Sequence, residues 1–387
     1  MASTIKDVAK LAGVSPSTVT RVLQDKSSIS DATKKKVRQA METLNYHPNV
    51  NARSLASNKT NVIGVVLPED SDAFYQNSFF PEVIRGIAQI AADHQYSIQL
   101  CTGQDNHQRL AILKDTILGR RVDGLIFLYG ELEDPLVNFA IDQEFPAVII
   151  GKTLSPLISF VDNNNEKAGL DATEYIINKG AKSIAFIGGR DQLFVSRERL
   201  NGYIKALKEY ELDVNEKLIA QVDEFTIERG YETIKELLEV GTIDGLVTAD
   251  SLFAEGAARY LNEKHIQMPI ITFDSVRPSV QIDAYVDVHT LELGRSSFKI
   301  LRNVIKSNNS KNMMCYRKSF HTRLKNYNSN KRRHKIPRLD FVPFLYVSSC
   351  RGIVYIRYRL TAIKFHSNKK LPSTNAWEFS IGLKLTT

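Results

Sequence analysis

The feature that most constrains this chain is a regular alternation of short apolar runs and amphipathic stretches that begins at Val62. Each apolar run has the length and composition of a buried strand, and each is followed by a stretch with helical spacing. Strands this apolar, separated by helices, are typical of parallel sheets that helices cover on both faces. The alternation restarts after "ISFVD" (158–162), which indicates two lobes of similar construction.

The expected strands lie at 62–67, 97–101, 123–128, 146–151, 158–162, 183–189, 218–222, 244–249 and 269–274. The triplet Asp-Gly-Leu opens a strand at 123–125 and again at 244–246, at a similar stage of each cycle. Such internal similarity is a further sign of two related α/β halves.

Two such lobes would face each other across a cleft, because ligands of open α/β folds bind at the carboxyl ends of the strands. We predict that this body covers 62–312. Lobe 1 is expected at about 62–160 plus 291–312, and lobe 2 at about 161–288.

An all-helical head is expected before the body, at 1–47. In "IKDVAKLAGVSPSTVTRVLQ" (5–24), Thr4 and Asp7 form a capping-box pattern at the start of a first helix. Gly13 ends that helix, since glycine readily takes the left-handed conformation of a helix stop. A second helix then begins at Ser15 and Pro16, which suit its cap and its first turn.

Two short helices braced by a third make a helix-turn-helix, whose second helix fits the major groove of DNA. Ser17, Thr18 and Arg21 are expected on the outward face of that second helix. Arg21 can reach a guanine edge, while the hydroxyls of Ser15, Thr18 and Thr20 suit phosphates or base edges. A plain three-helix bundle with a solvated face is the alternative, and the Gly-Val-Ser-Pro turn argues against it.

The charge distribution agrees with a DNA-binding head. The net charge of +8 divides into +6 for residues 1–61, −12 for 62–312 and +14 for 313–387. A basic head on an acidic body suggests that a polyanion is held at one end only.

Other functional classes find little support. No apolar run is long enough to span a membrane and no signal peptide opens the chain, so a cytoplasmic protein is expected. The three cysteines and eight histidines have no metal spacing, and no cofactor or metal is expected. "IIGKT" (149–153) ends like a phosphate-binding loop, but Pro146 stands where the motif needs glycine. An enzyme is not expected.

Residues 5–60 resemble the DNA-binding head of the LacI/GalR family of transcriptional regulators. The shared motifs are D-V-A-K-L-A-G-V-S, T-V-x-R-V, L-N-Y-x-P-N and A-R-x-L-A. The resemblance implies phosphate contacts for Thr4, Tyr46 and Asn49. Relatives usually carry a large residue at the position of Pro16, so the base read there stays open.

The same resemblance implies a hinge helix within 48–60. Val50, Ala52 and Leu55 could line one side of a helix of two turns, which is too short to be stable alone. The family pattern implies that it forms on the operator, with Leu55 as a wedge in the minor groove and Ala52 packed beside it.

Residues 62–312 resemble the periplasmic-binding-protein-like core of that family. Arg199 and Asp274 match positions at which relatives hold a small effector, and their donors and acceptors suit sugar hydroxyls. Asp250, Phe79 and Phe80 are further candidates, with a surface ion pair or core aromatics as the alternative. "NSFFPEVIRGI" (77–87) is most similar to family members that control maltose operons in Gram-positive bacteria.

We therefore expect a repressor that binds palindromic double-stranded operator DNA as a homodimer and is released by a small sugar, maltose or another α-glucoside. A two-fold protein matches a two-fold operator. The alternative is a sugar-binding transport protein without a genomic target.

The C-terminal segment 313–387 does not continue the pattern. It contains sixteen basic and two acidic residues, two of the three cysteines and the only tryptophan. We interpret it as an end foreign to the fold, such as a frame-shifted gene end, with a second nucleic-acid patch around 331–335 as the alternative.

Overall fold

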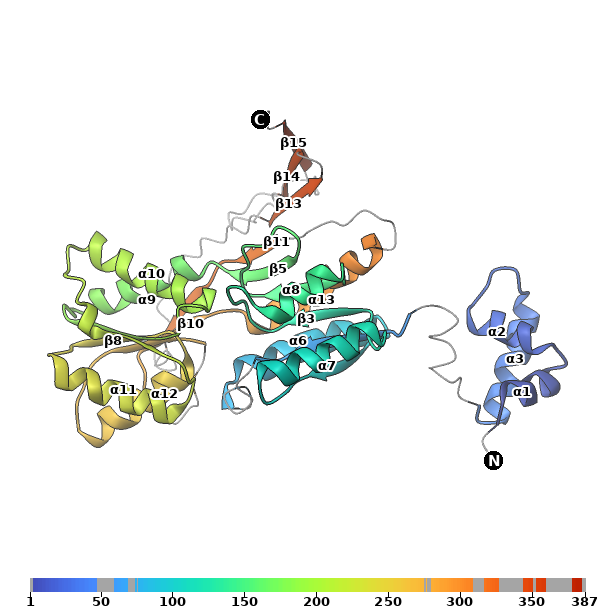
Figure 1. Ribbon diagram of the computed structural model, residues 1–387, viewed down its shortest axis with the longest axis horizontal. Coiled ribbons are helices and arrows are strands. Elements are labelled where there is room, and N and C mark those ends of the chain that lie inside the picture. The colour runs from blue at the N-terminus through green and yellow to red at the C-terminus, as the bar shows by residue number, and fades with distance from the viewer. Residues whose placement is uncertain are drawn as a thin grey trace, which may run out of the picture. The chain divides into compact units, whose positions relative to one another are not determined.

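The computed structural model divides the chain into two compact units, 1–61 and 62–387 (Figure 1). The residues that it describes are 3–46, 59–68, 74, 76–274, 276, 280–308, 317–326, 344–350, 353–359 and 378–384. The predicted hinge residues Asn49, Val50, Ala52 and Leu55 lie outside the described residues.

The first unit is the predicted bundle of three helices, α1 (Ile5–Ala12), α2 (Pro16–Leu23) and α3 (Asp31–Thr43). The backbone N–H and the hydroxyl of Thr4 donate to Asp7 Oδ2 at 2.8 and 2.7 Å. Gly13 ends α1 with φ +67°, and Ser15 Oγ accepts from the Thr18 amide at 3.1 Å. The turn chemistry predicted from the sequence is therefore confirmed.

The core of the head consists of small apolar side chains, two from each helix. They are Val8, Ala9, Val19, Val22, Val37 and Ala40. A core this small leaves the polar face of α2 free, which is what a recognition helix requires.

Lobe 1 of the second unit is built on a six-stranded parallel sheet. Its strand order is β11 (Arg317–Phe320), β5 (Ser159–Asn163), β4 (Ala147–Ile150), β3 (Gly124–Phe127), β1 (Val62–Val66) and β2 (Ser97–Cys101). Helices α6 (Phe79–Asp93) and α13 (Thr290–Asn308) cover one face, and α7 (Asn106–Leu118) and α8 (Pro135–Asp142) cover the other.

Lobe 2 repeats this plan. Its sheet has the order β12 (Arg323–Asn326), β10 (Ala284–Asp287), β9 (Ile270–Phe273), β8 (Gly245–Thr248), β6 (Ile184–Gly189) and β7 (Ile219–Val222), and only β12 is antiparallel to its neighbour. Helices α9 (Asn165–Asn178) and α10 (Phe194–Glu209) lie on one face, and α11 (Ile227–Val240) and α12 (Ser251–Glu263) on the other (Figure 1).

The repeated Asp-Gly-Leu triplets occupy equivalent places in the two lobes. Gly124 opens β3 and Gly245 opens β8, each the fourth strand in its sheet. The amide of Asp123 donates to Val62 O at 2.7 Å, and the amide of Asp244 donates to Ser183 O at 2.9 Å. The fold class predicted from the sequence, with two similar α/β lobes, is confirmed.

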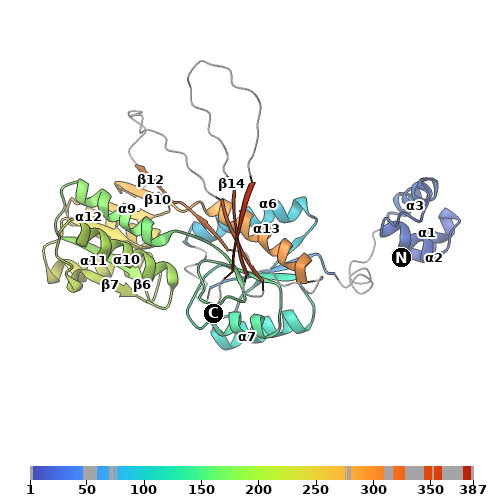
Figure 2. The same cartoon turned by 90° about the horizontal axis from the view of Figure 1, so that it is seen from above.

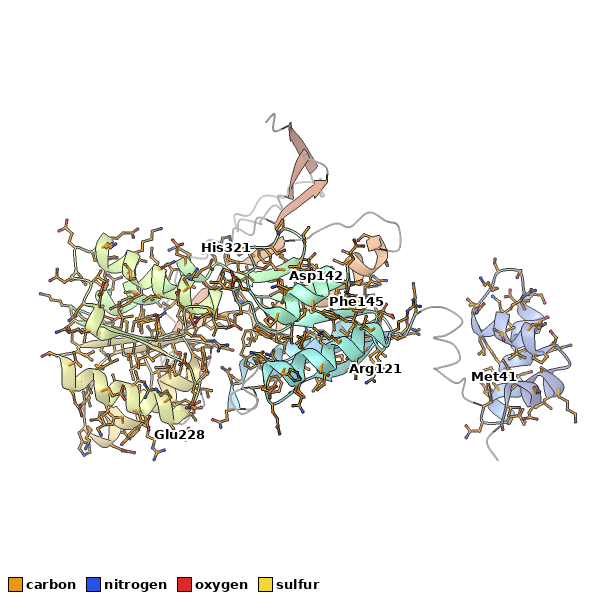
Figure 3. The ribbon with its side chains drawn as sticks, in the orientation of Figure 1. Met41, Arg121, Asp142, Phe145, Glu228 and His321 are labelled. Atoms are coloured by element: carbon orange, nitrogen blue, oxygen red, sulfur yellow. The ribbon has the colours of Figure 1, made fainter. Side chains whose placement is uncertain are left out.

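The chain passes between the lobes at three points within the described residues. These are the steps from β5 to α9, from β10 to α13 and from β11 to β12. His321 lies at the last of them (Figure 3), where His289 Nε2 is 3.0 Å from the His321 carbonyl oxygen. Connections of this kind let two lobes move as rigid bodies about a hinge.

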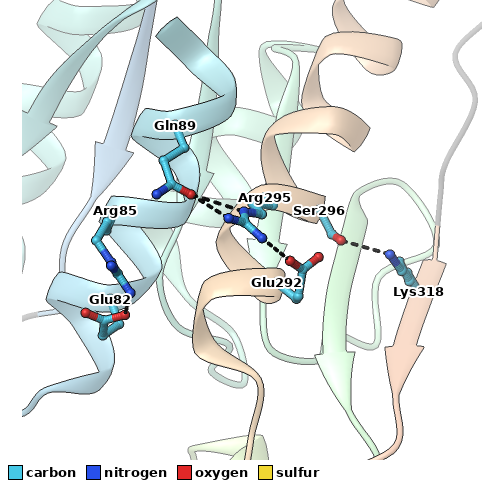
Figure 4. Close-up of polar contacts among 7 residues, drawn as sticks. All are labelled: Glu82, Arg85, Gln89, Glu292, Arg295, Ser296 and Lys318. Carbon is cyan, nitrogen blue, oxygen red and sulfur yellow. Dashed lines mark hydrogen bonds and ion pairs between the residues drawn. The ribbon is translucent and has the colours of Figure 1, made fainter. Parts of the chain in front are cut away.

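Strands β11 and β12 lie within 313–387, the segment predicted to be foreign to the fold. Lys318 Nζ donates to Ser296 Oγ of α13 at 2.8 Å, and Arg295 Nη2 of α13 donates to Gln89 of α6 at 2.8 Å (Figure 4). Helices α13 and α6 lie side by side (Figure 2). Residues 317–326 thus complete both main sheets. The sequence pattern did not reveal β10, β11 or β12, because none of them is a continuous apolar run: β10 reads AYVD, β11 RKSF and β12 RLKN.

Farther on, β13 (Phe344–Cys350), β14 (Ile353–Arg359) and β15 (Glu378–Lys384) pair as an antiparallel sheet. The boundary at 312 and the foreign origin of 313–387 stay predictions.

Candidate functional site

The first candidate site is the outer face of α2. Ser15, Pro16, Ser17 and Arg21 are exposed there, and Thr18 is half-buried. An exposed guanidinium on the second helix of this motif can reach base edges in the major groove. The structure therefore places these residues as a DNA-reading surface requires, and their individual base contacts stay predictions.

Several hydroxyls of this face are engaged within the head. Ser15 Oγ lies 2.9 Å from Ser17 Oγ and 2.9 Å from Thr18 Oγ1. The Thr20 hydroxyl donates to the Pro16 carbonyl at 3.2 Å, so only its lone pairs are available to DNA. The three hydroxyls at the start of α2 surround a helix N-terminus, which favours an anion such as a phosphate.

The two remaining predicted contacts in the head differ in exposure. Thr4 is exposed, and its hydrogen bonds hold the pKa of the Asp7 carboxyl below its usual value. Tyr46 is partly buried against the helical core. Their proposed phosphate contacts stay predictions.

The second candidate site is a cavity of about 710 Å³ between the lobes, at the carboxyl ends of strands from both sheets. All five residues predicted to hold an effector line it: Phe79, Phe80, Arg199, Asp250 and Asp274. This volume is within the range typical of small-molecule sites.

Arg199 is buried in lobe 2, where its guanidinium lies 3.9 Å from the centre of the Phe273 ring. Its Nε donates to Asn165 Oδ1 at 3.2 Å, and its Nη1 donates to the Ala249 carbonyl at 2.5 Å. Burial lowers the pKa of Arg199 to about 10, although the charge of Asp250 opposes that shift.

Asp250 joins the two lobes across the cavity. Its Oδ1 accepts from the Leu252 amide at 2.8 Å and thereby caps α12, while its Oδ2 accepts from Asn77 Nδ2 of lobe 1 at 2.7 Å. Burial raises the pKa of Asp250. It therefore lies in the cleft, and its contact with an effector stays a prediction.

Two further carboxylates line the side of the cavity that lies next to the connections between the lobes. Burial raises the pKa of Asp162 to about 7, and its Oδ1 accepts from Asn165 Nδ2 at 3.0 Å. Asp274 follows β9 with φ +65°, and its amide donates to Val286 O at 2.8 Å. A left-handed backbone at a residue other than glycine costs energy and is common at functional sites.

Phe79 and Phe80 belong both to the cavity wall and to the core. Their rings make an edge-to-face contact at 5.2 Å, and both pack against the core of lobe 1. The cavity role and the core role proposed from the sequence are thus compatible for this pair.

Sequence reasoning missed several residues that line the cavity, above all Arg109, Tyr129 and Asn163. Arg109 could have been found, because it lies on the face of α7 that also contains the buried residues Leu113 and Ile117. A charged residue on a buried helix face is uncommon and needs a reason.

Contacts at the rim of the cavity join lobe 1 to the segment around Leu193 in lobe 2. Glu131 forms an isolated bridge with Leu193, and the Leu132 amide donates to Gln192 O at 3.0 Å. Arg190 Nη2 lies 3.1 Å from Glu131 Oε1. We call these contacts the rim bridge.

A second pair across the rim connects Lys152 of lobe 1 with Glu198 of lobe 2. The rim bridge and this pair join the two lobes at the rim of the cavity, and both must break when the lobes separate.

The chain matches two family models. Residues 4–49 match the model of bacterial regulatory proteins of the lacI family. Residues 60–318 match the model of periplasmic binding proteins and the sugar binding domain of the LacI family.

Individual proteins agree with these models. The HTH-type transcriptional regulator MalR of Streptococcus pneumoniae is 54% identical over 318 residues, which are 82% of this chain and 97% of that protein. The transcriptional regulator CelR in complex with cellobiose has a TM-score of 0.63 at 26% identity, over 84% of this chain and 98% of that one. The lac repressor dimer bound to operator has a TM-score of 0.71 at 22% identity, over 85% and 99% of the two chains, which shows the fold.

A helix-turn-helix head followed by a two-lobed body with a ligand-sized cleft defines a ligand-controlled, DNA-binding transcriptional regulator. Neither matched model describes an enzyme. The chain belongs to the LacI family of bacterial regulatory proteins. Among the described helices, none is both long and apolar enough to cross a membrane.

Proposed function

We propose that this protein is a cytoplasmic repressor of an operon for carbohydrate utilisation, with maltose or another α-glucoside as its effector. The observation that carries the proposal is the cleft, in which a buried guanidinium, carboxylates and aromatic rings surround a cavity of about 710 Å³. Such a set offers donors and acceptors for hydroxyls and apolar faces for sugar rings. The 54% identity to a regulator named MalR supports maltose among the sugars.

The protein acts as a homodimer on a palindromic operator, with α2 of each protomer in the major groove and 48–60 as the hinge. A two-fold protein doubles its contacts on a two-fold site. Sugar closes or twists the lobes, shifts the two hinges relative to each other and releases the operator. Coupling of this kind typically changes affinity by about 5- to 150-fold.

A panel of mono- and disaccharides, measured by thermal stabilisation and by operator binding of the full chain, tests the proposal. Maltose or a related α-glucoside should raise the melting temperature, because a ligand of the native state stabilises it. The same sugar should weaken operator binding. Stabilisation by no sugar, or tighter operator binding with sugar, would refute sugar induction.

A sugar-binding transport protein is the competing function, and the head of the molecule argues against it. A salt titration of binding to random DNA separates the two functions. Phosphate contacts release counterions and give a steep dependence on salt, whereas a transport protein gives none.

The segment 313–387, predicted to be foreign to the fold, is proposed to arise from a shifted reading frame for its part beyond β12. The model of the periplasmic-binding and sugar-binding domain ends at 318. Sequencing the gene tests this proposal, since a frame-shift would show a family-like C-terminus in another frame.

A further inference from the structure

One hydrogen bond joins the two lobes inside the cavity, and sequence reasoning did not foresee its donor. Asn77 of lobe 1 and Asp250 of lobe 2 both line the cavity, and Asn77 Nδ2 donates to Asp250 Oδ2 at 2.7 Å. Asn77 is only 6% exposed, and Asp250 is half-buried. A hydrogen bond to a carboxylate is stronger than one between neutral groups, and a low local dielectric strengthens it further. We call this contact the interior bond.

Each partner of the interior bond is also fixed within its own lobe. Asn77 Oδ1 accepts from the Phe79 amide at 2.9 Å, at the start of α6. Asp250 Oδ1 accepts from the Leu252 amide at 2.8 Å, at the start of α12. Neither side chain can turn away from the other lobe without losing a hydrogen bond at the start of its own helix. The interior bond therefore joins two helix starts through side chains that are held in place on both sides.

The two helices are themselves packed tightly into their lobes. Helix α6 packs on α13, where the Val83 carbonyl leaves no room for a Cβ atom on Gly294. Helix α12 packs on α11 in the same way, because the Ile227 carbonyl leaves no room for a Cβ atom on Gly256. Helices that touch backbone to backbone have little freedom to shift separately. The two ends of the interior bond thus move with whole lobes and are not free to adjust locally.

The ion pairs at the rim are weaker candidates for holding the lobes together. The side chains of Arg190 and Glu131 are 33% and 22% exposed, and those of Lys152 and Glu198 are 43% and 15% exposed. Water and salt screen ion pairs that are partly open to solvent, so such pairs contribute little. The interior bond is more deeply buried on its lobe 1 side and is less screened.

We propose that Asn77 is a positioning residue that acts through Asp250. The interior bond holds the two lobes together in the absence of ligand, and it fixes the carboxylate that is predicted to contact the effector. Because K_d rises as the population of the binding-competent arrangement falls, Asn77 sets how much of the binding free energy of an effector is used to bring the lobes together.

The interior bond also connects the effector site of lobe 2 with lobe 1. A carboxylate oxygen has two lone pairs, so a hydroxyl that donates to Asp250 either adds to the interior bond or replaces it. In both cases the occupancy of Asp250 changes the contact between the lobes. The holding of the lobes does not depend on the chemistry of the effector, and only its consequence for the response to sugar rests on the proposed function.

Hydrogen exchange of two backbone amides at the rim measures separation of the lobes without any sugar. The Leu132 amide donates to Gln192 O at 3.0 Å, and the Phe194 amide donates to Gly130 O at 3.3 Å, each from one lobe to the other. Mass spectrometry of the ligand-free full chain follows their exchange. Asn77→Asp places two carboxylates against each other, and like charges repel. Exchange of both amides should become about 10- to 100-fold faster, as expected for the loss of a hydrogen bond to a charged group.

A swap of the two side chains tests the interior bond specifically. Asp250→Asn alone sets one amide against another and should also speed exchange at the rim. The double variant Asn77→Asp/Asp250→Asn again has one amide and one carboxylate, with donor and acceptor exchanged between the lobes, so exchange should return close to the wild-type rate. The start of α12 is preserved, since asparagine caps a helix about as well as aspartate. This double-mutant cycle separates the contact from the effects of the single substitutions.

Two controls accompany the cycle. Asn138→Asp makes the same substitution at an exposed position of α8 and should change neither rim amide. The amides of Asp123 and Asp244 bond within their own lobes, so their protection in every variant confirms folding. If Asn77→Asp alone does not fold, the return of protection from Asp250→Asn to the double variant carries the test.

Unchanged exchange at the rim in folded Asn77→Asp, or exchange in the double variant as fast as in the faster single variant, would overturn the proposed role of Asn77. Either result would leave sugar control intact, because no sugar is present in the experiment. Binding of no sugar by wild type would refute the proposed function and leave the interior bond unaffected.

Discussion

The head and the body present the residues predicted to contact ligands in opposite ways. In the head, Ser17 and Arg21 are exposed and contribute nothing to the small apolar core. In the body, Arg199 is buried and Asp250 is half-buried, and both are bonded to the main chain of their own lobe. Specificity for DNA can therefore be changed without changing stability, whereas recognition in the cleft and the stability of the body are coupled.

The largest effect is expected from Arg199→Ala. It leaves Asp250, Asp162 and Asp274 without their shared cation, and breaking a buried charge cluster typically costs about 3–5 kcal/mol. The melting temperature of the body should fall by roughly 10 °C in a thermal scan, and the response to sugar should be lost. Arg259→Ala is the matched control, because Arg259 pairs with Glu263 on the surface. Equal melting temperatures for the two variants would contradict the coupling.

The next effect concerns the pH dependence of stability. The folded-state pKa of Asp162 is raised to about 7 from an ordinary value of 3.8, so the folded state binds the proton more tightly. Stability from this group is fully present below about pH 4 and is lost as the pH rises to about 7. Asp162→Asn should remove that loss of stability. The loss is about 2–4 kcal/mol, because each unit of difference in pKa corresponds to about 1.4 kcal/mol.

Thermal scans of wild type and Asp162→Asn at several pH values check this prediction. The free energy of unfolding of the variant should rise relative to that of wild type between pH 4 and 7, and the difference should stay constant at higher pH. Asp191→Asn is a control of opposite sign, because the hydrogen bond from Arg197 lowers the pKa of Asp191. A constant difference between wild type and Asp162→Asn would show that folding does not raise the pKa of Asp162.

A smaller effect is expected from Arg21→Ala, and only in DNA binding. Loss of a contact to a base edge should lower the preference for operator over scrambled DNA by about 1–3 kcal/mol. Its melting temperature should match that of wild type, since exposed substitutions rarely cost more than about 0.5 kcal/mol. Competition binding measures the preference. Lys36→Ala, also exposed, should weaken both DNAs alike.

The smallest effect is expected at the rim bridge. Glu131→Gln removes the partly exposed ion pair with Arg190, which is worth at most about 1 kcal/mol. Sugar affinity should fall no more than about 5-fold, and the difference from wild type should shrink at high salt. Glu228→Gln, at an exposed position of α11, should have no effect. A loss of 100-fold would mean that Glu131 contacts the sugar.

Sequence alone predicted the head and the alternation of the lobes, because both rest on local signals. Gly13 and Ser15 define the turn within a few residues, and each apolar strand can be recognised from its own composition. The four-residue strands β10, β11 and β12 carry no such signal. They form by pairing with strands that are otherwise open edges: β10 pairs with β9, β11 with β5 and β12 with β10.

The cleft was predicted only in part, for the same physical reason. Arg199 and Asp274 stand in recognisable motifs, whereas the setting of Arg109 depends on the carbonyl of Leu67 and the hydroxyl of Tyr129, which are distant in sequence. Unmet donors and acceptors, such as Arg109 Nε, exist only once the chain has folded.

Strands β11 and β12 also decide when the protein can finish folding during its synthesis. The head is complete once about residue 61 has been synthesised, but neither sheet is complete until 317–326 have been synthesised. At about 5–20 residues per second, a ribosome needs roughly 15–50 s to cover that interval. Until then β5 and β10 are open edges that invite pairing with other chains. A nascent chain that ends before β12 would thus have a folded DNA-binding head and a body that is prone to aggregation.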